Sequence, residues 1–238
     1  MSESGKRLRK VVNALLDFIK PGITTQDIDN KAELLIKKND GRPSFKFVKG
    51  YSWATCLSVN NQVVHTPPCQ RVLLNGDILT LDIGLYYKGH HTDYATTIIV
   101  GKTNNKKINV FLETGKKTLN KAIKCVQKGN YIGKISQTIQ TEIEKKSYSI
   151  IPELTGHGIG RDLHEDPLVP CFLDGPIEKT YEMKKGLVLA IEVIYSKGKG
   201  KIKYEKGNDW SLITVDNSLA ACFENTVAIT DKGAVILV

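Results

Sequence analysis

The chain has 238 residues, of which 41% are hydrophobic and 25% charged, and its formal net charge is +9. This length fits one large domain or two small ones, and it is enough to bury a substantial core. The composition is that of an ordinary globular protein, and no apolar stretch reaches the length of a membrane span.

The first part of the chain predicts two helices followed by strands. Apolar residues recur with a helical period over residues 5–20, and Pro21 and Gly22 end the pattern. Thr24 begins a second helical pattern that continues to Ile36. Residues 45–48 and 54–64 are predicted to be strands. Residues 1–7 lack the apolar core of a secretory signal.

The next segment carries two aspartates in a predicted β-hairpin. A tight turn at residues 88–89 sets Asp82 opposite Ala95. The same register sets Asp93 opposite Gly84. The two acids are then diagonal neighbours on one face, roughly 7–8 Å apart at the backbone. Because two acids on a buried face cost stability unless a cation lies between them, the hairpin predicts a metal site.

A weak repeat relates the two halves of the chain. Residues 104–128 and 132–146 predict two more helices, and the chain then becomes rich in predicted strands. Gly22 and Gly129 each lie between two predicted helices. Residues 76–82 and 186–192 each run from a glycine through a strand to an acid. These matches share their order and nearly their offset, so they predict two α+β halves related by a pseudo-twofold axis.

Residues 156–167 form a glycine-rich segment with two of the chain's five histidines, His157 and His164. Glycines allow a backbone to approach a ligand closely. A single histidine more often has a structural role than a ligand role. For two histidines in one glycine-rich loop, the two roles are about equally expected. Their spacing does not fit the helical His-x-x-x-His pattern of zinc proteases.

Two further acids, Glu192 and Glu224, lie inside apolar strands. One such acid would lie on an exposed strand face, but four in one chain favour pairing with a cation. Together the acids and His157 form a carboxylate-rich set that can hold two divalent ions through bridging carboxylates. The set comprises Asp82, Asp93, His157, Glu192 and Glu224.

The densest basic stretch, residues 196–206, is predicted to be an exposed loop or hairpin. Such a stretch attracts RNA, ribosomes or acidic partners, or it is simply a solvated lysine-rich surface. It has no aromatic ladder of the kind that stacks bases, so the solvated surface is the favoured interpretation and ribosome association is the alternative. The five cysteines are scattered without a Cys-x-x-Cys pair, which indicates a reducing compartment, and we expect a cytoplasmic protein.

The chain resembles a type I methionine aminopeptidase over nearly its whole length. The resemblance rests on five motifs in order, at residues 58–68, 82–93, 156–167, 191–192 and 223–224. It implies the α+β pita-bread fold of the creatinase/aminopeptidase group. In that fold a pseudo-twofold antiparallel sheet carries helices on its outer face and a central dimetal site. It further implies a single catalytic domain over residues 1–238.

The resemblance also assigns roles to individual residues. Asp93 and Glu224 would bridge two metals, with Asp82 on one metal and His157 and Glu192 on the other. His65, His164 and Glu192 would be catalytic, and both histidines would contact the substrate. A methionine pocket is implied at Tyr51, Cys56, Leu163 and Trp210. The oxygen-rich ligands favour Mn²⁺, Fe²⁺ or Co²⁺, and Zn²⁺ also fits.

The chain departs from the family pattern in three places. Asn225 replaces the usual histidine after the last glutamate, and Leu163 stands where an aromatic residue is frequent. The segment around His65 reads Val-His-Thr-Pro-Pro rather than Cys-His-Gly-Ile-Pro. The first two changes affect pocket shape and the surroundings of the metal ligands, but no implied ligand is missing.

The expected activity is removal of the initiator methionine from nascent polypeptides with a small second residue. We expect nascent N-termini as partners, ribosome association through the basic surface, no membrane association and a monomeric state. One alternative is an Xaa-Pro-type aminopeptidase on the same fold. The other is a non-catalytic pita-bread module that binds protein or RNA, although such modules typically lose metal ligands.

Overall fold

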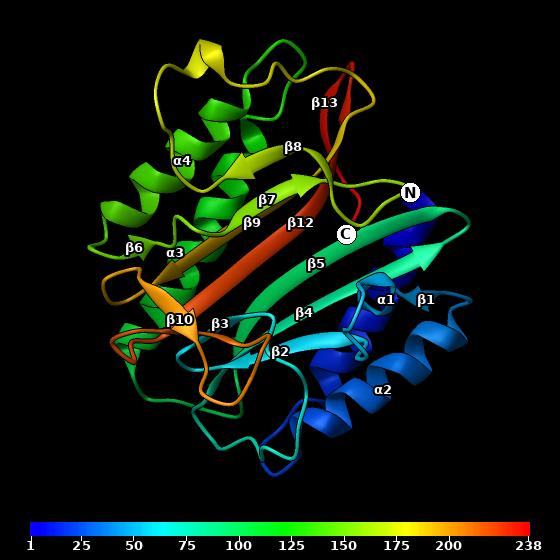
Figure 1. Ribbon diagram of the computed structural model, residues 1–238, viewed down its shortest axis with the longest axis vertical. Helices are drawn as coiled ribbons and strands as arrows, with labels where there is room; N and C mark the ends of the chain where they lie inside the picture. The colour runs from blue at the N-terminus through cyan, green and yellow to red at the C-terminus, as the bar shows by residue number, and fades with distance from the viewer.

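The computed structural model describes residues 1–238, which form an α+β fold with two helix pairs behind one large antiparallel sheet (Figure 1). The N-terminal half contains α1 (Ser2–Phe18), α2 (Thr25–Lys38), β1 (Arg42–Pro43), the 3₁₀ helix η1 (Phe45–Phe47), β2 (Thr55–Val59), β3 (Gln62–Val64), β4 (Ile78–Tyr87) and β5 (His90–Ile99).

The C-terminal half repeats the order of helices before strands. It contains α3 (Lys106–Lys124), α4 (Ile132–Glu144), β6 (Ser149–Ile150), β7 (Thr155–Gly158), β8 (Glu165–Pro170), the 3₁₀ helix η2 (Ile177–Lys179), β9 (Val188–Ser196), β10 (Ile202–Tyr204), β11 (Leu212–Thr214), β12 (Ala220–Thr230) and β13 (Gly233–Ile236).

The large sheet has ten strands, and its main path runs β1-β4-β5-β12-β9-β7-β8. Strands β2, β13 and β6 pair with β4, β12 and β9. A separate three-stranded sheet, β10-β11-β3, joins strands from both halves. The central strands β5 and β12, green and orange in Figure 1, are the place where the two halves meet.

Each half buries its own core between its helices and the sheet. One cluster includes Leu8, Leu15 and Ile28 from α1 and α2 together with apolar residues of β4. The other, larger cluster includes Phe111 from α3 and Ile135 from α4 together with residues of β9 and β12. The helices therefore cover one face of the sheet, and the opposite face is left for the residues discussed below (Figure 1).

The predicted repeat is present in the backbone. Gly22 and Gly129 both have positive φ, at 93° and 84°, as do Gly76 and Gly186, at 92° and 88°. The amide of Gly22 donates to the carbonyl of Leu73 at 2.9 Å, and that of Gly129 donates to Met183, also at 2.9 Å. The equivalent glycines thus make equivalent turns, which supports the predicted pseudo-twofold relation.

The N-terminal helices lie near their predicted bounds. Helix α1 begins three residues before the predicted start and ends at Phe18, just before Pro21 and Gly22. The start signal at Thr24 is confirmed, because Thr24 and Asp27 form a capping box at the beginning of α2. The later helices α3 and α4 are both shorter at their C-terminal ends than predicted.

One strand prediction was wrong, and another was right only in part. Residues 45–48 form a 3₁₀ turn, in which Phe47 donates to Ser44 and Val48 donates to Phe45, each at 3.0 Å. Residues 54–64 form two strands in different sheets, because Asn60 takes a positive φ of 60° and turns the chain. Apolar residues continue through the turn at residues 45–48 and on both sides of the turn at Asn60, so the apolar pattern alone does not indicate either turn.

All five cysteines are free. No helix is both long enough and apolar enough to cross a bilayer.

Candidate metal centre and substrate pocket

The predicted hairpin is confirmed in its register. Strands β4 and β5 pair Asp82 with Ala95 and Gly84 with Asp93. The turn residues Lys88 and Gly89 have φ values of 46° and 84°, as a two-residue hairpin turn requires. Asp82 and Asp93 therefore lie on the same face of the sheet.

The other acids join them through a row that crosses the sheet. Asp82 pairs with Ala95, Ala95 with Glu224, and Glu224 with Glu192, over strands β4, β5, β12 and β9. Cys56 on β2 extends the row on the far side of Asp82. Because directly paired residues project from the same face, three acids from both halves point to one side of the sheet.

His157 reaches this row from β7, where it pairs with Ala190 of β9. The approach is close, since a Cβ atom on the preceding residue, Gly156, would lie 2.4 Å from the carbonyl oxygen of Ala190. Glycine is therefore required here by space. The His157 Nδ1 lies 2.8 Å from the carbonyl oxygen of Gly158, which leaves Nε2 facing Glu192 Oε1 at 3.8 Å.

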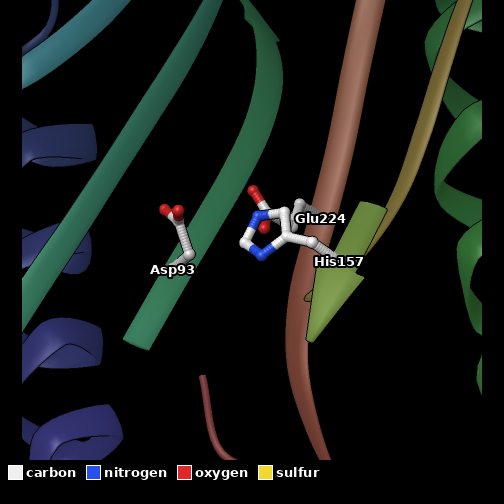
Figure 2. A group of neighbouring side chains, drawn as sticks. All are labelled: Asp93, His157 and Glu224. Atoms are coloured by element: carbon white, nitrogen blue, oxygen red, sulfur yellow. The ribbon is translucent and has the colours of Figure 1, made fainter. Parts of the chain in front are cut away.

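Three of these side chains form a compact group of possible metal ligands. One ligand atom from each of Asp93, His157 and Glu224 lies within 4.8 Å of the others, and all three residues are buried. Figure 2 shows them gathered from β5, β7 and β12. Asp82 and Glu192 lie outside this group but line the same cavity.

The electrostatics of the carboxylates are unfavourable without a cation. Burial raises the pKa of Asp93 to about 7. Burial and repulsion from Asp93 raise the pKa of Glu192 to about 8. The pKa values of Asp82 and Glu224 both lie well above the usual range. Burial is the larger cause, and repulsion from the neighbouring carboxylates is the smaller one.

The donor set fits a divalent cation. Glu224 Oε1 is buried without a hydrogen-bond partner, although buried carboxylate oxygens are normally satisfied. No lysine or arginine pairs with any of the four acids. Burial lowers the pKa of His157 to about 4, so the imidazole is neutral and able to coordinate a metal. Oxygen ligands with one imidazole suit the divalent ions of metallohydrolases.

All eleven predicted site residues line one cavity of about 280 Å³. They are Tyr51, Cys56, His65, Asp82, Asp93, His157, Leu163, His164, Glu192, Trp210 and Glu224. The placement brings the predicted set together, while the role of each residue stays a prediction.

The apolar end of the cavity is built around Tyr51. Its hydroxyl donates to the carbonyl of Thr55 at 2.8 Å, and its ring meets Trp210 edge-on with centroids 5.1 Å apart. Trp53 also packs against Tyr51, with ring centroids 5.2 Å apart. This end of the cavity is therefore aromatic, which suits an apolar ligand.

The other two predicted site histidines, His65 and His164, line the same cavity as the acids and His157. The rings of His164 and His157 are 4.5 Å apart and nearly perpendicular. His65 takes a positive φ of 57°, an uncommon conformation for a residue with a side chain. Burial, and then the neighbouring His164, lower the pKa of His65, and burial lowers that of His164.

Comparison with known proteins identifies the family. The pattern of metallopeptidase family M24 matches residues 1–231. The chain belongs to metallopeptidase family M24. Methionine aminopeptidase 1 of Bacillus subtilis is 41% identical over 239 aligned positions, which cover 100% of this chain and 94% of that protein.

Solved structures agree with the fold. A methionine aminopeptidase from Thermotoga maritima superposes with a TM-score of 0.94 at 36% identity, covering 100% of this chain and 94% of that one. The prolidase from Pyrococcus furiosus gives 0.79 at 22% identity over 100% of this chain and 62% of that one, a likeness of fold alone. The predicted pita-bread fold and the predicted family resemblance are confirmed.

The departures from the M24 pattern occupy different places. Leu163 lines the cavity, so it shapes the pocket directly. Asn225 does not line it: its amide nitrogen donates to the carbonyl oxygen of Val238 at 2.5 Å. Asn225 thus contacts the C-terminal residue, and Glu224 Oε1 has no hydrogen-bond partner.

Sequence reasoning missed three lining residues, Phe45, Val48 and Val64. Phe45 begins the 3₁₀ helix in the segment that the apolar pattern assigned to a strand, and Val48 directly follows that helix. Val64 directly precedes His65, so its place beside a candidate catalytic residue was the one available signal.

Proposed function

We propose that this protein is a methionine aminopeptidase that removes the initiator methionine from nascent chains with a small second residue. The proposal rests on one observation: the five proposed metal ligands and the aromatic pocket residues line the same cavity. Full-length similarity to proteins named methionine aminopeptidase supports it. An unbranched thioether suits such an apolar, polarisable pocket.

Two divalent ions, Mn²⁺, Fe²⁺ or Co²⁺ in our proposal, would be held by five residues. Asp93 and Glu224 would be shared between the ions, Asp82 would bind one, and His157 and Glu192 would bind the other. Bound divalent ions lower the pKa of water and so supply a hydroxide nucleophile at neutral pH.

The remaining chemistry belongs to the chain. Glu192 would accept the proton that the bound water loses on becoming the nucleophile, since its carboxylate lines the cavity with the other proposed ligands. His164 would donate a hydrogen bond to the scissile carbonyl as negative charge develops there. His65 would orient the next peptide unit or stabilise the departing amine.

A peptide assay tests this function. We expect the purified protein to release methionine from Met-Ala-Ser in Mn²⁺ or Co²⁺, and a chelator to stop the release. Equal cleavage of Met-Pro and Leu-Pro peptides would favour the Xaa-Pro alternative. Metal binding without any peptidase activity, together with salt-sensitive RNA binding, would favour the non-catalytic module.

We propose further that the enzyme acts as a cytoplasmic monomer and docks on ribosomes through its basic loop. Lys199 and Lys201 are exposed on this loop, and Lys197 is half-buried. Replacing all three by alanine should weaken co-sedimentation with ribosomes, mainly at low salt. Unchanged co-sedimentation would argue against docking at this loop.

A further inference from the structure

His91 is a buried histidine to which the proposed chemistry gives no role. It lies two residues before Asp93 on β5, on the same face of the strand, and it is 3% exposed. Its neighbour His90, by contrast, is only partly buried and its ring faces the carbonyl of Lys88 at 3.2 Å. A buried imidazole needs polar partners, and those of His91 belong to other parts of the site.

The first partner is Ser44. His91 Nδ1 lies 2.9 Å from Ser44 Oγ, and Ser44 is fully buried. Ser44 fits against β4 because Gly84 has no side chain, since a Cβ there would lie 2.6 Å from Ser44 Cβ. Ser44 directly precedes Phe45, which lines the cavity. The hydrogen bond thus ties the apolar wall of the pocket to the strand that carries Asp93.

The second partner is the loop that follows β7. The backbone amide of His91 donates to the carbonyl oxygen of Gly160 at 2.8 Å. This loop continues through Leu163 and His164, both of which line the cavity.

Aromatic packing fixes the ring itself. Phe47 meets His91 edge-on with centroids 5.0 Å apart, and Tyr86 lies against it at 4.7 Å. Phe47 belongs to the same 3₁₀ turn as Phe45, so the imidazole holds this turn by a hydrogen bond at one end and by packing at the other. His91 is therefore in contact with the pocket wall, the loop of His164 and the strand of Asp93.

We propose that His91 is a positioning residue that sets the methionine pocket by holding Ser44 and the Phe45 wall against β5. The inference rests on the proposed function and deepens it by assigning pocket selectivity to a residue outside the cavity lining. The His91 side chain contacts Ser44 and Phe47, which flank Phe45 in the pocket wall. The hydrogen bond to Gly160 comes from the His91 backbone amide, so it persists in side-chain variants. The effect of losing the side chain should therefore fall on substrate binding.

Steady-state kinetics of His91 variants test the proposal. In the Mn²⁺-loaded enzyme, His91→Phe keeps the ring but loses the hydrogen bond. We expect KM for Met-Ala-Ser to rise at least about fivefold with kcat changed less than about twofold. The ratio of kcat/KM for Met-Ala-Ser to that for Leu-Ala-Ser should fall by a similar factor. His91→Asn, whose amide matches the position of Nδ1, should restore most of the parent KM.

A Ser44 variant tests the same hydrogen bond from its other partner. Ser44→Ala should raise KM like His91→Phe, and the double variant should be no worse than either single one, since both remove the same hydrogen bond. If His91→Phe fails to fold, Ser44→Ala and His91→Asn carry the comparison. His90→Ala is the matched control and should leave KM unchanged.

Three outcomes overturn the inference. Unchanged KM and selectivity in folded His91→Phe and Ser44→Ala would do so, as would additive effects in the double variant. Loss of thermal stability alone, with parental KM, would reduce His91 to a structural role and also refute it. An inactive parent enzyme would instead refute the proposed function, so the two failures are distinguishable.

Discussion

At the scale of single residues, the site depends on acids that the fold places at an electrostatic cost. Asp93 and Glu224 are nearly inaccessible to water, at 4% and 3% exposure, and neither has a cationic partner among the side chains. A buried carboxylate without a cationic partner is unfavourable, and Glu224 Oε1 also lacks a hydrogen-bond partner, so a bound divalent ion would account for these acids better than a contribution to stability would.

The first prediction concerns these two acids. Asp93→Ala and Glu224→Ala should each lower kcat/KM for Met-Ala-Ser by more than about a hundredfold, because each would remove a ligand that we propose the two ions share. Calorimetric titration should show the matching loss of Mn²⁺ binding, and circular dichroism should show the parent fold. Asp231→Ala, which removes an exposed acid paired with Lys185, is the control. Normal turnover in either ligand variant would contradict the metal assignment.

At the scale of elements, the site depends on how closely neighbouring segments approach. Strand β7 contacts β9 so closely that only glycine fits at position 156, and this contact delivers His157 to the acids. On the other side of the sheet, the start of β2 is fixed by Asp29 of α2. Both contacts act through the backbone, so they position strands rather than individual side chains.

Gly156→Ala should disturb the delivery of His157. The added methyl group would meet the carbonyl of Ala190, so β7 must shift, at a cost of about 1–3 kcal/mol. We expect Mn²⁺ affinity to fall about tenfold or more. Gly175→Ala, at a glycine with open space around it, should cost only the strain of its positive φ and keep metal affinity. Equal metal affinities in the two variants would contradict the role of this contact.

Asp29→Ala should weaken the N-terminal half. Asp29 Oδ1 accepts hydrogen bonds from the amides of Ala54 and Thr55, each at 2.9 Å, and from the Thr55 hydroxyl at 2.8 Å. Their loss leaves buried donors unpaired, and we expect a fall of about 2–4 kcal/mol in the free energy of unfolding by urea. Asp29→Asn keeps an acceptor oxygen and should cost less. Equal stability of the alanine variant and the parent would count against this account.

At the scale of the whole molecule, the two halves meet at a narrow junction. Strands β5 and β12 pair only through Glu224 with Ala95 and Asn225 with Tyr94. Two threonines extend the junction. The Thr226 hydroxyl bonds both backbone groups of Asp93, at 2.9 and 2.7 Å. Thr97 does the same for Cys222, at 3.0 and 2.8 Å.

Thr226→Val should therefore affect both stability and metal binding. It keeps the side-chain volume but leaves the backbone of Asp93 without partners, which should lower the unfolding free energy by about 1–3 kcal/mol. Thr97→Val should cost a similar amount. Because Thr226 holds a ligand residue, only its variant should also weaken Mn²⁺ binding. Similar metal affinities in both variants would show that the junction does not position Asp93.

The single-domain organisation over residues 1–238 stays a prediction that calorimetry can test. Since the proposed ligands come from both halves, Mn²⁺ should bind only the assembled molecule and stabilise it, by about 2.7 kcal/mol at a hundredfold excess over Kd. We expect one unfolding transition, with a midpoint that rises with Mn²⁺ and falls with a chelator. Two separate transitions would instead indicate independently folding halves.

The sequence by itself determined those features that local chemistry encodes. The hairpin turn fixed the register of Asp82 and Asp93, and Thr24 fixed the start of α2. Paired glycines revealed the two halves. Turn residues, caps and apolar period act over a few neighbours, so they can be recognised without the fold.

Only the tertiary structure decided the rest. It divided residues 54–64 between two sheets and turned residues 45–48 into a 3₁₀ segment that lines the pocket. It aligned Asp82, Glu224 and Glu192 in one row, and it placed His91 against Ser44. These outcomes depend on contacts between residues far apart in the chain, for which no local pattern carries a signal.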